Sequence, residues 1–311
     1  MSHFDQWTLG VDVVRKLREH IDGKNIVITG ATLGSIGGAV FLALAEAHPA
    51  QLFLLGRSDA KTSAAIAAFQ RIQQQRTSTS FSSPSGNIDA TTAEVAAAAS
   101  STNTSTTALH AIPCDLSDLS SVRLAAAAIR AQALGGKIHV LFNNAGVHLV
   151  YPYRTTAQGF ECHFGLNHYA HFLLTAELWP LLCAATTADN DAVIVTTSSS
   201  GCQMSPMLWD EIERLPQWGG GESYQPWLGY ALSKLANALF TVGLARRIAT
   251  AAEGSDRLAS VRAFAVQPGQ PKTHLWDSVT EEGPTSVMEA FRLGKDGPLA
   301  GYDSMSLFSF I

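Results

Sequence analysis

The chain has 311 residues, of which 46% are hydrophobic and 15% are charged, so it can bury the core of one large α/β domain. The net charge of −5 and the pI near 6.0 argue against a surface that binds nucleic acid or an anionic membrane. The four cysteines are scattered and form no Cys-x-x-Cys pair, which indicates free thiols of a reducing compartment rather than disulfides or a zinc knuckle.

The N-terminal stretch, residues 1–23, is predicted to form an amphipathic helix. Charged side chains such as Asp12, Arg15 and Glu19 punctuate it, so it lacks the apolar core of a signal peptide. No window in the chain approaches the ~18 consecutive apolar residues that a membrane helix needs. We therefore expect a soluble, cytoplasmic protein without a membrane span.

A strand, a glycine-rich turn and a helix are predicted to follow one another near the N-terminus. Residues 25–28 form an apolar run typical of a buried strand, and residues 39–48 continue as an Ala-rich helix. In this order, glycines let the backbone approach a dinucleotide pyrophosphate, and the helix N-terminus offers unpaired N–H groups. The alternative is a glycine-rich connection without a ligand. The candidate phosphate-binding residues of the turn are Gly30, Thr32, Gly34, Ser35, Ile36 and Gly37.

The next predicted strand ends close to an arginine. It spans residues 51–55, and Arg57 follows it with no acidic residue at the strand end. In dinucleotide folds this position meets the adenosine ribose, where an acid binds the 2′-hydroxyl and an arginine suits a 2′-phosphate. Arg57 therefore favours NADP(H) over NAD(H), although the same side chain would also suit a solvated surface position.

A Ser-, Thr- and Ala-rich stretch, residues 77–108, separates a helix predicted at residues 59–76 from a third strand at residues 109–113. Because this composition buries little apolar surface, we interpret it as an insertion rather than a domain boundary. Asp115 follows the strand and could accept hydrogen bonds from an adenine amino group, with Leu116 beside it among the candidate cofactor contacts. Asp115 could instead cap the next helix.

A fourth strand is predicted at residues 138–142, after a helix at residues 119–134. The strand is followed by two asparagines, an alanine and a glycine. Small and amide residues at the carboxyl end of a strand suit the close passage of a ligand, and asparagine side chains can tie neighbouring strands together. The candidate cofactor contacts here are Asn143, Ala145 and Gly146.

A long region, residues 156–184, is predicted to be helical and contains several histidines. His168 and His171 are one turn apart, but only Glu161 or Cys162 offers a further ligand at a matching spacing. We therefore interpret these histidines as ordinary helix residues and expect no metal site.

A cluster of hydroxyl side chains follows the strand predicted at residues 193–195. It ends in the serines 198–200, and Tyr230 and Lys234 follow on a helical stretch, four residues apart and thus on one face. A neighbouring ammonium favours the phenolate, so it lowers the pKa of a phenol from its ordinary value near 10. A serine could then hold a substrate oxygen while Tyr230 gives or takes a proton. This is acid–base chemistry at a carbonyl or alcohol carbon.

Taken in chain order, these motifs resemble those of the short-chain dehydrogenase/reductase superfamily. The matching segments are Thr29-Gly30 to Gly37, Asn143-Asn144-Ala145-Gly146, the serines after the fifth strand, and Tyr230 with Lys234. Asn167 also stands where the family has its catalytic asparagine. A sixth strand at residues 261–266 precedes Pro268, Gly269 and Thr273, which are similar to the family's Pro-Gly-x-x-x-Thr segment.

Within the superfamily, residues 167–175 and 230–237 are most similar to the retinol-dehydrogenase-like branch. One feature departs from the family pattern. The usual spacing is Gly-x-x-x-Gly-x-Gly, whereas the third glycine here, Gly37, falls one residue late. Either the turn contains an extra residue, or Ser35 replaces the middle glycine, in which case its hydroxyl could donate a hydrogen bond to a phosphate.

The resemblance implies a role for each catalytic candidate. Tyr230 would be the general acid in reduction or the base in oxidation, and Lys234 would lower its pKa and hold the nicotinamide ribose. Ser199 would orient the substrate oxygen, with Ser198 or Ser200 as alternatives. Asn167 would carry a water-linked proton relay to Lys234.

For the cofactor, the resemblance implies that the segment after Pro268 and Gly269 closes over the nicotinamide, where Thr273 would contact the carboxamide. The loops at residues 202–228 and 270–298 should overhang the carboxyl ends of the strands. Their aromatic residues suggest a bulky, apolar or aromatic carbonyl substrate, although ordinary loop packing would also explain them. The aromatic and methionine residues of this side are Tyr151, Tyr153, Met204, Met207, Trp209, Trp218, Trp227 and Trp276.

The sequence thus predicts one domain over residues 1–311, a Rossmann-type doubly wound parallel sheet of about seven strands with helices on both faces. The function predicted from it is NADP-dependent interconversion of a ketone or aldehyde and its alcohol. The alternatives are a non-enzymatic NADP-binding or sensing protein, and a net non-redox member of the fold such as an epimerase or dehydratase. Family usage implies a homodimer or homotetramer, formed through the long helices after the fourth and fifth strands.

Overall fold

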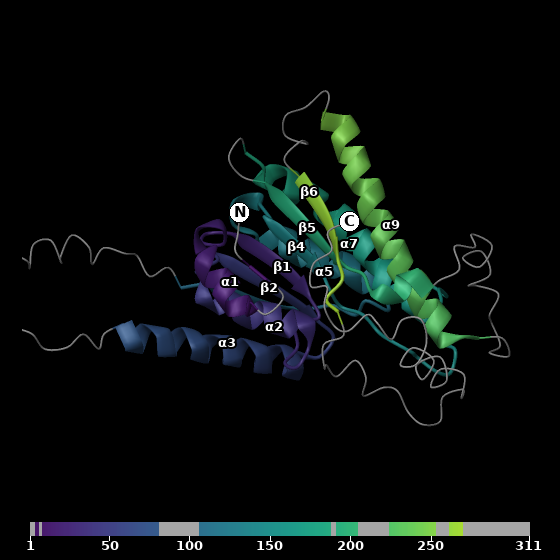
Figure 1. Ribbon diagram of the computed structural model, residues 1–311, viewed down its shortest axis with the longest axis horizontal. Helices are drawn as coiled ribbons and strands as arrows, with labels where there is room; N and C mark the ends of the chain where they lie inside the picture. Colours follow the sequence, from purple (N-terminus) through teal and green to yellow (C-terminus); the bar gives the residue numbers. More distant parts are fainter. Residues whose placement is uncertain are drawn as a thin grey trace, which may run out of the picture.

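A parallel sheet of six strands forms the centre of the computed structural model (Figure 1). The structure describes residues 4–5, 8–80, 106–187, 191–204, 224–252 and 261–269. The strands are β1 (Asn25–Thr29), β2 (Gln51–Gly56), β3 (Ala108–Pro113), β4 (Val140–Asn143), β5 (Ala192–Thr197) and β6 (Val261–Val266).

The strand order across the sheet is β3-β2-β1-β4-β5-β6, and all neighbouring pairs are parallel. The order changes direction between β1 and β4, and in doubly wound sheets the ligand crevice lies outside the carboxyl ends of the strands at such a switch point. The predicted fold class is therefore confirmed. The described residues contain six strands, whereas about seven were predicted.

Helices cover both faces of the sheet (Figure 1). On one face lie α1 (Gly10–Lys16), α2 (Ile36–Ala43) and α3 (Asp59–Ser80), and on the other lie α5 (Leu119–Gln132), α7 (Ala170–Ala185) and α9 (Pro226–Ala252). The short elements are the 3₁₀ turns η1 (Arg18–His20), η2 (Leu44–Glu46), η3 (Leu134–Gly136) and η5 (Ser200–Met204), the short helix α6 (Cys162–Phe164) and the π-helical turn η4 (Gly165–Tyr169).

The apolar run of β1 serves two separate cores. Ile26 and Ile28 pack against α1, α2 and α3, whereas Val27 between them packs in the core formed with α5 and α7. Successive side chains of a strand point to opposite faces, so a strand covered on both sides is apolar at every position. This is why β1 has no alternating pattern and places its carboxyl end, Thr29, inside the protein.

Several predicted helix boundaries differ from the structure. The helix expected at residues 1–23 is observed only as α1 and η1, and the helix expected at residues 39–48 begins earlier, at Ile36. The helix expected from residue 59 extends to Ser80, so the predicted insertion begins within α3, and its residues 81–105 lie outside the described part of the chain.

The region predicted to be helical from residue 156 begins instead at Cys162, so this prediction was wrong for its first turns. Thr155 forms an antiparallel bridge with Glu161, and Gly159 between them has φ +82°, which reverses the chain. A Cβ at Gly165 would overlap Thr156, so glycine lets this turn fold back on the helix that follows.

Helix α9 is long and apolar enough, by length and mean hydropathy, to cross a membrane, and it is the one described helix of this kind. More than half of the qualifying stretch, Pro226–Ala251, is buried inside the protein. Its buried side carries Lys234 and Asn237, both hydrogen-bonded to Thr197 O at the end of β5. Packing on the sheet therefore accounts for its composition.

Candidate active site

The glycine-rich turn after β1 is shaped by close contacts with the end of β4. Gly30 has φ +72°, and a Cβ there would lie 2.9 Å from Cα of Ala145. A Cβ at Gly37 would overlap Nδ2 of Asn144 and lie 2.8 Å from Gly30 O. Both positions therefore need glycine for packing within the protein.

Ser35 lies where the glycine spacing of the turn departs from the family pattern. Ser35 is the N-cap of α2, where its Oγ accepts the Gly38 N–H at 3.0 Å and lies 2.7 Å from Thr32 O and 3.0 Å from Gly30 O. Ser35 thus caps α2, and Gly37 supplies the close packing against Asn144. Because the hydroxyl has a single proton, which these carbonyls already accept, the hydrogen bond from Ser35 to a phosphate stays a prediction.

The ends of β2 and β3 lie side by side, with Gly56 paired to Pro113, and carry the residues predicted to meet the adenosine. Arg57 is exposed there. Asp115 uses Oδ1 to accept hydrogen bonds from the N–H and hydroxyl of Ser117, at 2.9 and 2.7 Å. Asp118 caps α5. Leu116 is buried, and contacts of these residues with an adenine stay predictions.

The asparagines after β4 fix the switch point of the sheet. Asn144 donates from its side chain to Thr29 O at 3.0 Å, so it ties β4 to β1 as predicted. Asn143 instead ties β4 to α7, donating to Thr175 Oγ1 at 3.0 Å. The Thr29 hydroxyl accepts the N–H groups of Asn144 and Ala145 at 2.9 and 3.0 Å. No sequence pattern predicted this use of Thr29.

The catalytic candidates come together at the carboxyl end of β5. Tyr230, in the first turns of α9, lies beside Ser199, since a Cβ at Gly201 would lie 3.4 Å from Tyr230 Cε1 and 3.5 Å from Ser199 Oγ. The Ser199 hydroxyl also accepts the Gly201 N–H at 3.2 Å. Ser198 is turned elsewhere, because its hydroxyl donates to Lys234 O at 2.8 Å. Of the two, Ser199 is therefore the serine that meets the phenol, although Ser199 and Tyr230 are far apart in the sequence.

Lys234 is buried one turn after Tyr230. Its ammonium donates to Thr197 O at 3.0 Å and lies 5.8 Å from the centroid of the Tyr230 ring. Burial lowers the pKa of Lys234 from 10.5 to about 8. A Cβ at Gly146 would lie 3.4 Å from Lys234 Nζ and 3.2 Å from Asn167 Oδ1, so glycine lets the β4 end lie against both groups.

The expected effect of Lys234 on the phenol is not observed. The pKa of Tyr230 is raised above its ordinary value because burial disfavours the phenolate more than the hydrogen bond from Ser199 favours it. The ammonium points to Thr197 O, which explains why it does not reverse this shift. The predicted lowering of the Tyr230 pKa was therefore wrong.

Asn167 lies in the π-helical turn η4 and is fully buried. Its side chain accepts the Val147 N–H at 2.8 Å, and its Nδ2 lies 3.1 Å from Val147 O and 2.9 Å from Ser233 Oγ. It thus joins the segment after β4 to α9 beside Tyr230. The water-linked relay from Asn167 to Lys234 stays a prediction.

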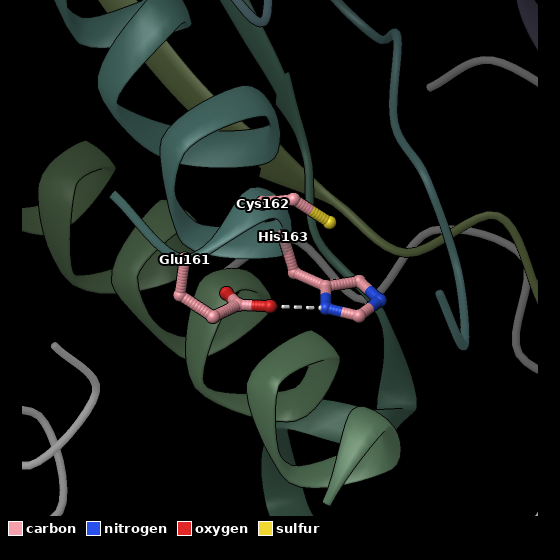
Figure 2. A group of neighbouring side chains, drawn as sticks. All are labelled: Glu161, Cys162 and His163. Carbon is pink, nitrogen blue, oxygen red and sulfur yellow. Dashed lines mark hydrogen bonds and ion pairs between the residues drawn. The ribbon is translucent and has the colours of Figure 1, made fainter. Parts of the chain in front are cut away.

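Glu161, Cys162 and His163 bring possible metal-ligand atoms within 4.8 Å of one another (Figure 2). Their chemistry does not fit an ion. Glu161 Oε1 and His163 Nδ1 point at each other, 2.6 Å apart, and the thiol of Cys162 points away from Glu161. His163 Nε2 accepts the Val150 N–H, and burial raises the pKa of the Cys162 thiol to about 12, so neither group is a ready ligand.

Buried polar atoms also gather at the ends of β4 and β5. Asn143 Oδ1 and Thr196 Oγ1, on paired residues of β4 and β5, and Thr197 Oγ1 are buried without a hydrogen-bond partner among the described residues. Buried acceptors and hydroxyls are rarely left unpaired. Gly269, after β6, has φ +73°. Thr273, Met207, Trp209, Trp218 and Trp276 lie outside the described residues.

A family model described as short chain dehydrogenase matches residues 85–210. The chain is 38% identical over 166 residues to a polyprenol dehydrogenase of Homo sapiens, and 39% identical over 155 residues to a retinol dehydrogenase 12 of Mus musculus. These matches cover 53% and 50% of the chain but only 46% and 42% of the relatives, so the chain spans less than half of their length.

A longer match joins the chain to a short-chain dehydrogenase/reductase of Armillaria gallica, with 30% identity over 258 residues, 82% of the chain and 67% of the relative. Solved structures share the fold. A short chain dehydrogenase from Salmonella enterica has a TM-score of 0.54 with 19% identity, covering 89% of this chain and 91% of that one. The Pseudomonas aeruginosa RhlG/NADP complex has a TM-score of 0.52 with 18% identity, covering 91% and 93%.

Proposed function

Since the chain belongs to the short-chain dehydrogenase/reductase family, in its retinol-dehydrogenase-like branch, we propose that it is an NADP(H)-dependent oxidoreductase acting on a bulky, apolar carbonyl compound and its alcohol. The observation that carries the proposal is the Tyr230 phenol, which lies beside Ser199 and one turn from the buried ammonium of Lys234. A module that only bound a nucleotide would need no such acid–base pair.

In the reductive direction, the Ser199 hydroxyl would orient the carbonyl oxygen and the Tyr230 O–H would donate its proton to that oxygen. A bound nicotinamide cofactor would supply the hydride to the carbonyl carbon, and the product would be the alcohol. Burial keeps the pKa of Tyr230 high, so the phenol holds its proton at neutral pH and is ready to act as the acid. Lys234 would stabilise the phenolate left behind.

The cofactor would lie over the switch point between β1 and β4. The turn at Gly30 to Gly37 and the N-terminus of α2 would face the pyrophosphate, and Gly146 and Lys234 would face the nicotinamide ribose. Arg57, exposed at the end of β2, supports a 2′-phosphate and hence NADP(H). Structural neighbours include both an NAD and an NADP complex, so the fold alone does not decide between the two.

The substrate class rests on the relatives and on the surroundings of Tyr230. The relatives are named for retinol and polyprenol, which are long apolar alcohols. Near the predicted substrate side, Tyr153, Trp227 and Leu228 gather with Phe164 and Tyr224 in a small apolar cluster. Such surroundings suit an apolar chain better than a charged metabolite.

A homodimer, or a homotetramer, is part of the proposal. Phe172 on α7 and Leu239 on α9 are 52% and 45% exposed, and these are the helices expected to form the contact. Light scattering of the purified protein measures the mass, and a monomer at micromolar concentration would contradict this part. The cytoplasmic location stays a prediction.

The test is NADPH consumption with all-trans-retinaldehyde, farnesal and benzaldehyde, comparing the wild type with Tyr230→Phe. We expect Tyr230→Phe to lower turnover by about 10³-fold, because it removes the acid, while the Kd for NADPH stays nearly unchanged. Tyr169→Phe is the matched control, because it removes a phenolic hydroxyl at the end of η4. Turnover by Tyr230→Phe at the wild-type rate would refute the mechanism. Tight NADPH binding without consumption would favour the sensing or non-redox alternatives.

A further inference from the structure

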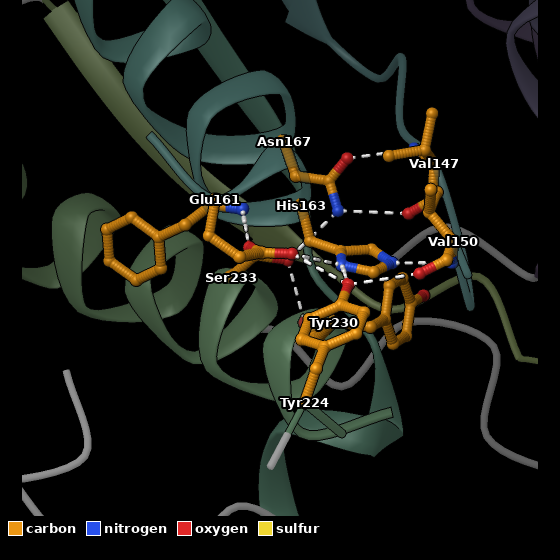
Figure 3. A network of polar contacts seen from close by, with 9 residues as sticks. Val147, Val150, Glu161, His163, Asn167, Tyr224, Tyr230 and Ser233 are labelled. Carbon is orange, nitrogen blue, oxygen red and sulfur yellow. Dashed lines mark hydrogen bonds and ion pairs between the residues drawn. The ribbon is translucent and has the colours of Figure 1, made fainter. Parts of the chain in front are cut away.

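Glu161, His163 and Tyr224 form a buried hydrogen-bonded cluster next to Tyr230 (Figure 3). Their exposed fractions are 2%, 0% and 5%. The Tyr224 hydroxyl lies 3.0 Å from Glu161 Oε1 and 3.1 Å from His163 Nδ1. The members come from the start of α6 and from the residues just before α9, so this Glu161–His163–Tyr224 cluster joins two segments that are distant in the sequence.

The hydrogen bonds fix the protonation of the cluster. Val150 N–H can only donate, so His163 Nε2 must accept it, at 3.0 Å. His163 Nδ1 then carries the proton and donates it to Glu161 Oε1 at 2.6 Å. Burial alone would raise the pKa of Glu161, but the hydrogen bonds from His163 and from the Phe164 N–H outweigh it and lower the pKa. The cluster is thus an ionised carboxylate beside a neutral imidazole.

The cluster holds one end of the segment 147–150, which follows the β4 asparagines. Val150 donates to His163 and accepts from the Tyr224 hydroxyl at 3.0 Å, so both of its backbone groups are bound. At the other end, Asn167 binds both backbone groups of Val147. His163 and Asn167 are one turn apart on the same helical stretch (Figure 3). Between Val147 and Val150, Leu149 has φ +49°, a conformation that a non-glycine residue rarely keeps without such support.

The segment 147–150 and the Glu161–His163–Tyr224 cluster both lie against the turn of α9 that carries Tyr230. The His148 ring stands edge-on to Tyr230, with centroids 4.4 Å apart, and the His163 ring lies 6.3 Å from Tyr230. Gly229 precedes Tyr230, and a Cβ there would lie 3.1 Å from Glu161 Oε1 and 3.2 Å from His163 Nδ1. The backbone of α9 therefore rests directly on the carboxylate–imidazole pair.

We propose that the Glu161–His163–Tyr224 cluster is a positioning unit, which holds the segment 147–150 and the Gly229–Tyr230 turn so that the phenol faces Ser199. The proposal rests on the proposed function and deepens it, because it adds positioning residues that have no contact with the reacting atoms. Loss of the cluster should lower kcat without weakening NADPH binding, since the glycine-rich turn is held by other contacts.

The decisive variant is Tyr224→Phe, which removes one oxygen and keeps the ring. We expect faster hydrogen exchange in a peptide that covers 147–150, and a kcat for retinaldehyde lower by on the order of 10- to 100-fold, because small misplacements of a catalytic group are costly. The Kd for NADPH should match the wild type. Tyr169→Phe is the control. In a second pair, His163→Leu should repeat the loss, and His163→Gln, which keeps an acceptor for Val150 N–H, should restore part of the rate.

The proposal would be overturned if hydrogen exchange in the 147–150 peptide were equally fast in Tyr224→Phe and in Tyr169→Phe. It would also be overturned if this exchange were faster in Tyr224→Phe while the kcat of that variant stayed unchanged. Tyr224→Phe keeps the test available if His163→Leu does not fold. If the wild type reduces none of the probes, the proposed function fails, and the exchange of 147–150 alone then decides whether the cluster holds this segment.

Discussion

The two halves of the candidate site are built in different ways. Around the glycine-rich turn, the contacts are made by backbone groups and short side chains: Gly30 lies against Ala145, and Asn144 reaches Thr29. Around Tyr230, long polar side chains from separate segments meet in the interior, and Lys234, Glu161 and His163 are all buried. The first half is defined by shape, and the second by buried charge and hydrogen bonding.

The difference suggests that substitutions should act differently in each half. Where shape matters, an added methyl group should be enough to disturb the fold, because a packed backbone has little room to give. Where buried polar groups matter, the loss of one atom should change reactivity more than stability, provided that the remaining partners stay satisfied.

Gly37→Ala tests the shape of the first half and should have the largest effect on stability. The new Cβ would overlap Asn144, so we expect a free energy of unfolding lower by about 2–3 kcal/mol, measured by denaturant titration. Gly243→Ala in α9 is the control. Among the described residues a Cβ there meets no heavy atom within 4 Å, and it should raise stability by up to about 1 kcal/mol. Equal stability of Gly37→Ala and the wild type would contradict the packing at this turn.

Arg57→Asp tests whether an exposed cation of the first half selects the cofactor. We expect the Kd for NADPH to rise about 10-fold, which corresponds to about 1.4 kcal/mol, because the 2′-phosphate loses its partner and meets a carboxylate. The Kd for NADH should stay level or fall. Arg71→Asp, an equal change of charge further along α3, is the control in the same titration. An equal rise of the Kd values for NADPH and NADH would show that Arg57 does not bind the 2′-phosphate.

Lys234 offers a smaller test of buried charge in the second half. Its pKa is about 8 in the folded protein and 10.5 ordinarily, so in this window the unfolded chain binds a proton that the folded protein does not. The contribution of Lys234 to stability should therefore rise with pH, by about 1–2 kcal/mol from about pH 8 to about pH 9.5. Thermal unfolding of the wild type and of Lys234→Met across this range measures it. If the stability of the two proteins changed with pH in the same way, the lowered pKa of the buried Lys234 would be contradicted.

The sequence predicted the first half well, because its contacts are local to a motif. The order of strand, glycine-rich turn and helix is observed, although Gly37 lies in α2 rather than in the turn. The amide residues at the end of β4 indicated the tie from Asn144 to β1. The role of Ser35 needed coordinates, since spacing alone allowed both an insertion and a replacement. The structure shows that Ser35 is the N-cap of α2, through the bond from the Gly38 N–H.

In the second half, the sequence predicted which residues meet but not their electrostatics. The meeting of Tyr230 with Ser199 followed from the family pattern, whereas the direction of the Tyr230 pKa depends on burial, which spacing does not show. The Glu161–His163–Tyr224 cluster was missed because residues 156–161 were interpreted as helix and because Tyr224 lies 61 residues from His163. The available signal was an acidic residue three positions before Phe164, where Glu161 caps α6.

The hydroxyl of Ser35 also bears on the thermodynamics of nucleotide binding. It joins the N-terminus of α2 to the carbonyls of Gly30 and Thr32, so the turn is already ordered when a dinucleotide arrives. Little backbone freedom then remains to be lost on association, and the entropic penalty that a looser loop would incur is met during folding instead. Ser35 therefore makes the proposed phosphate-binding turn a preorganised receptor.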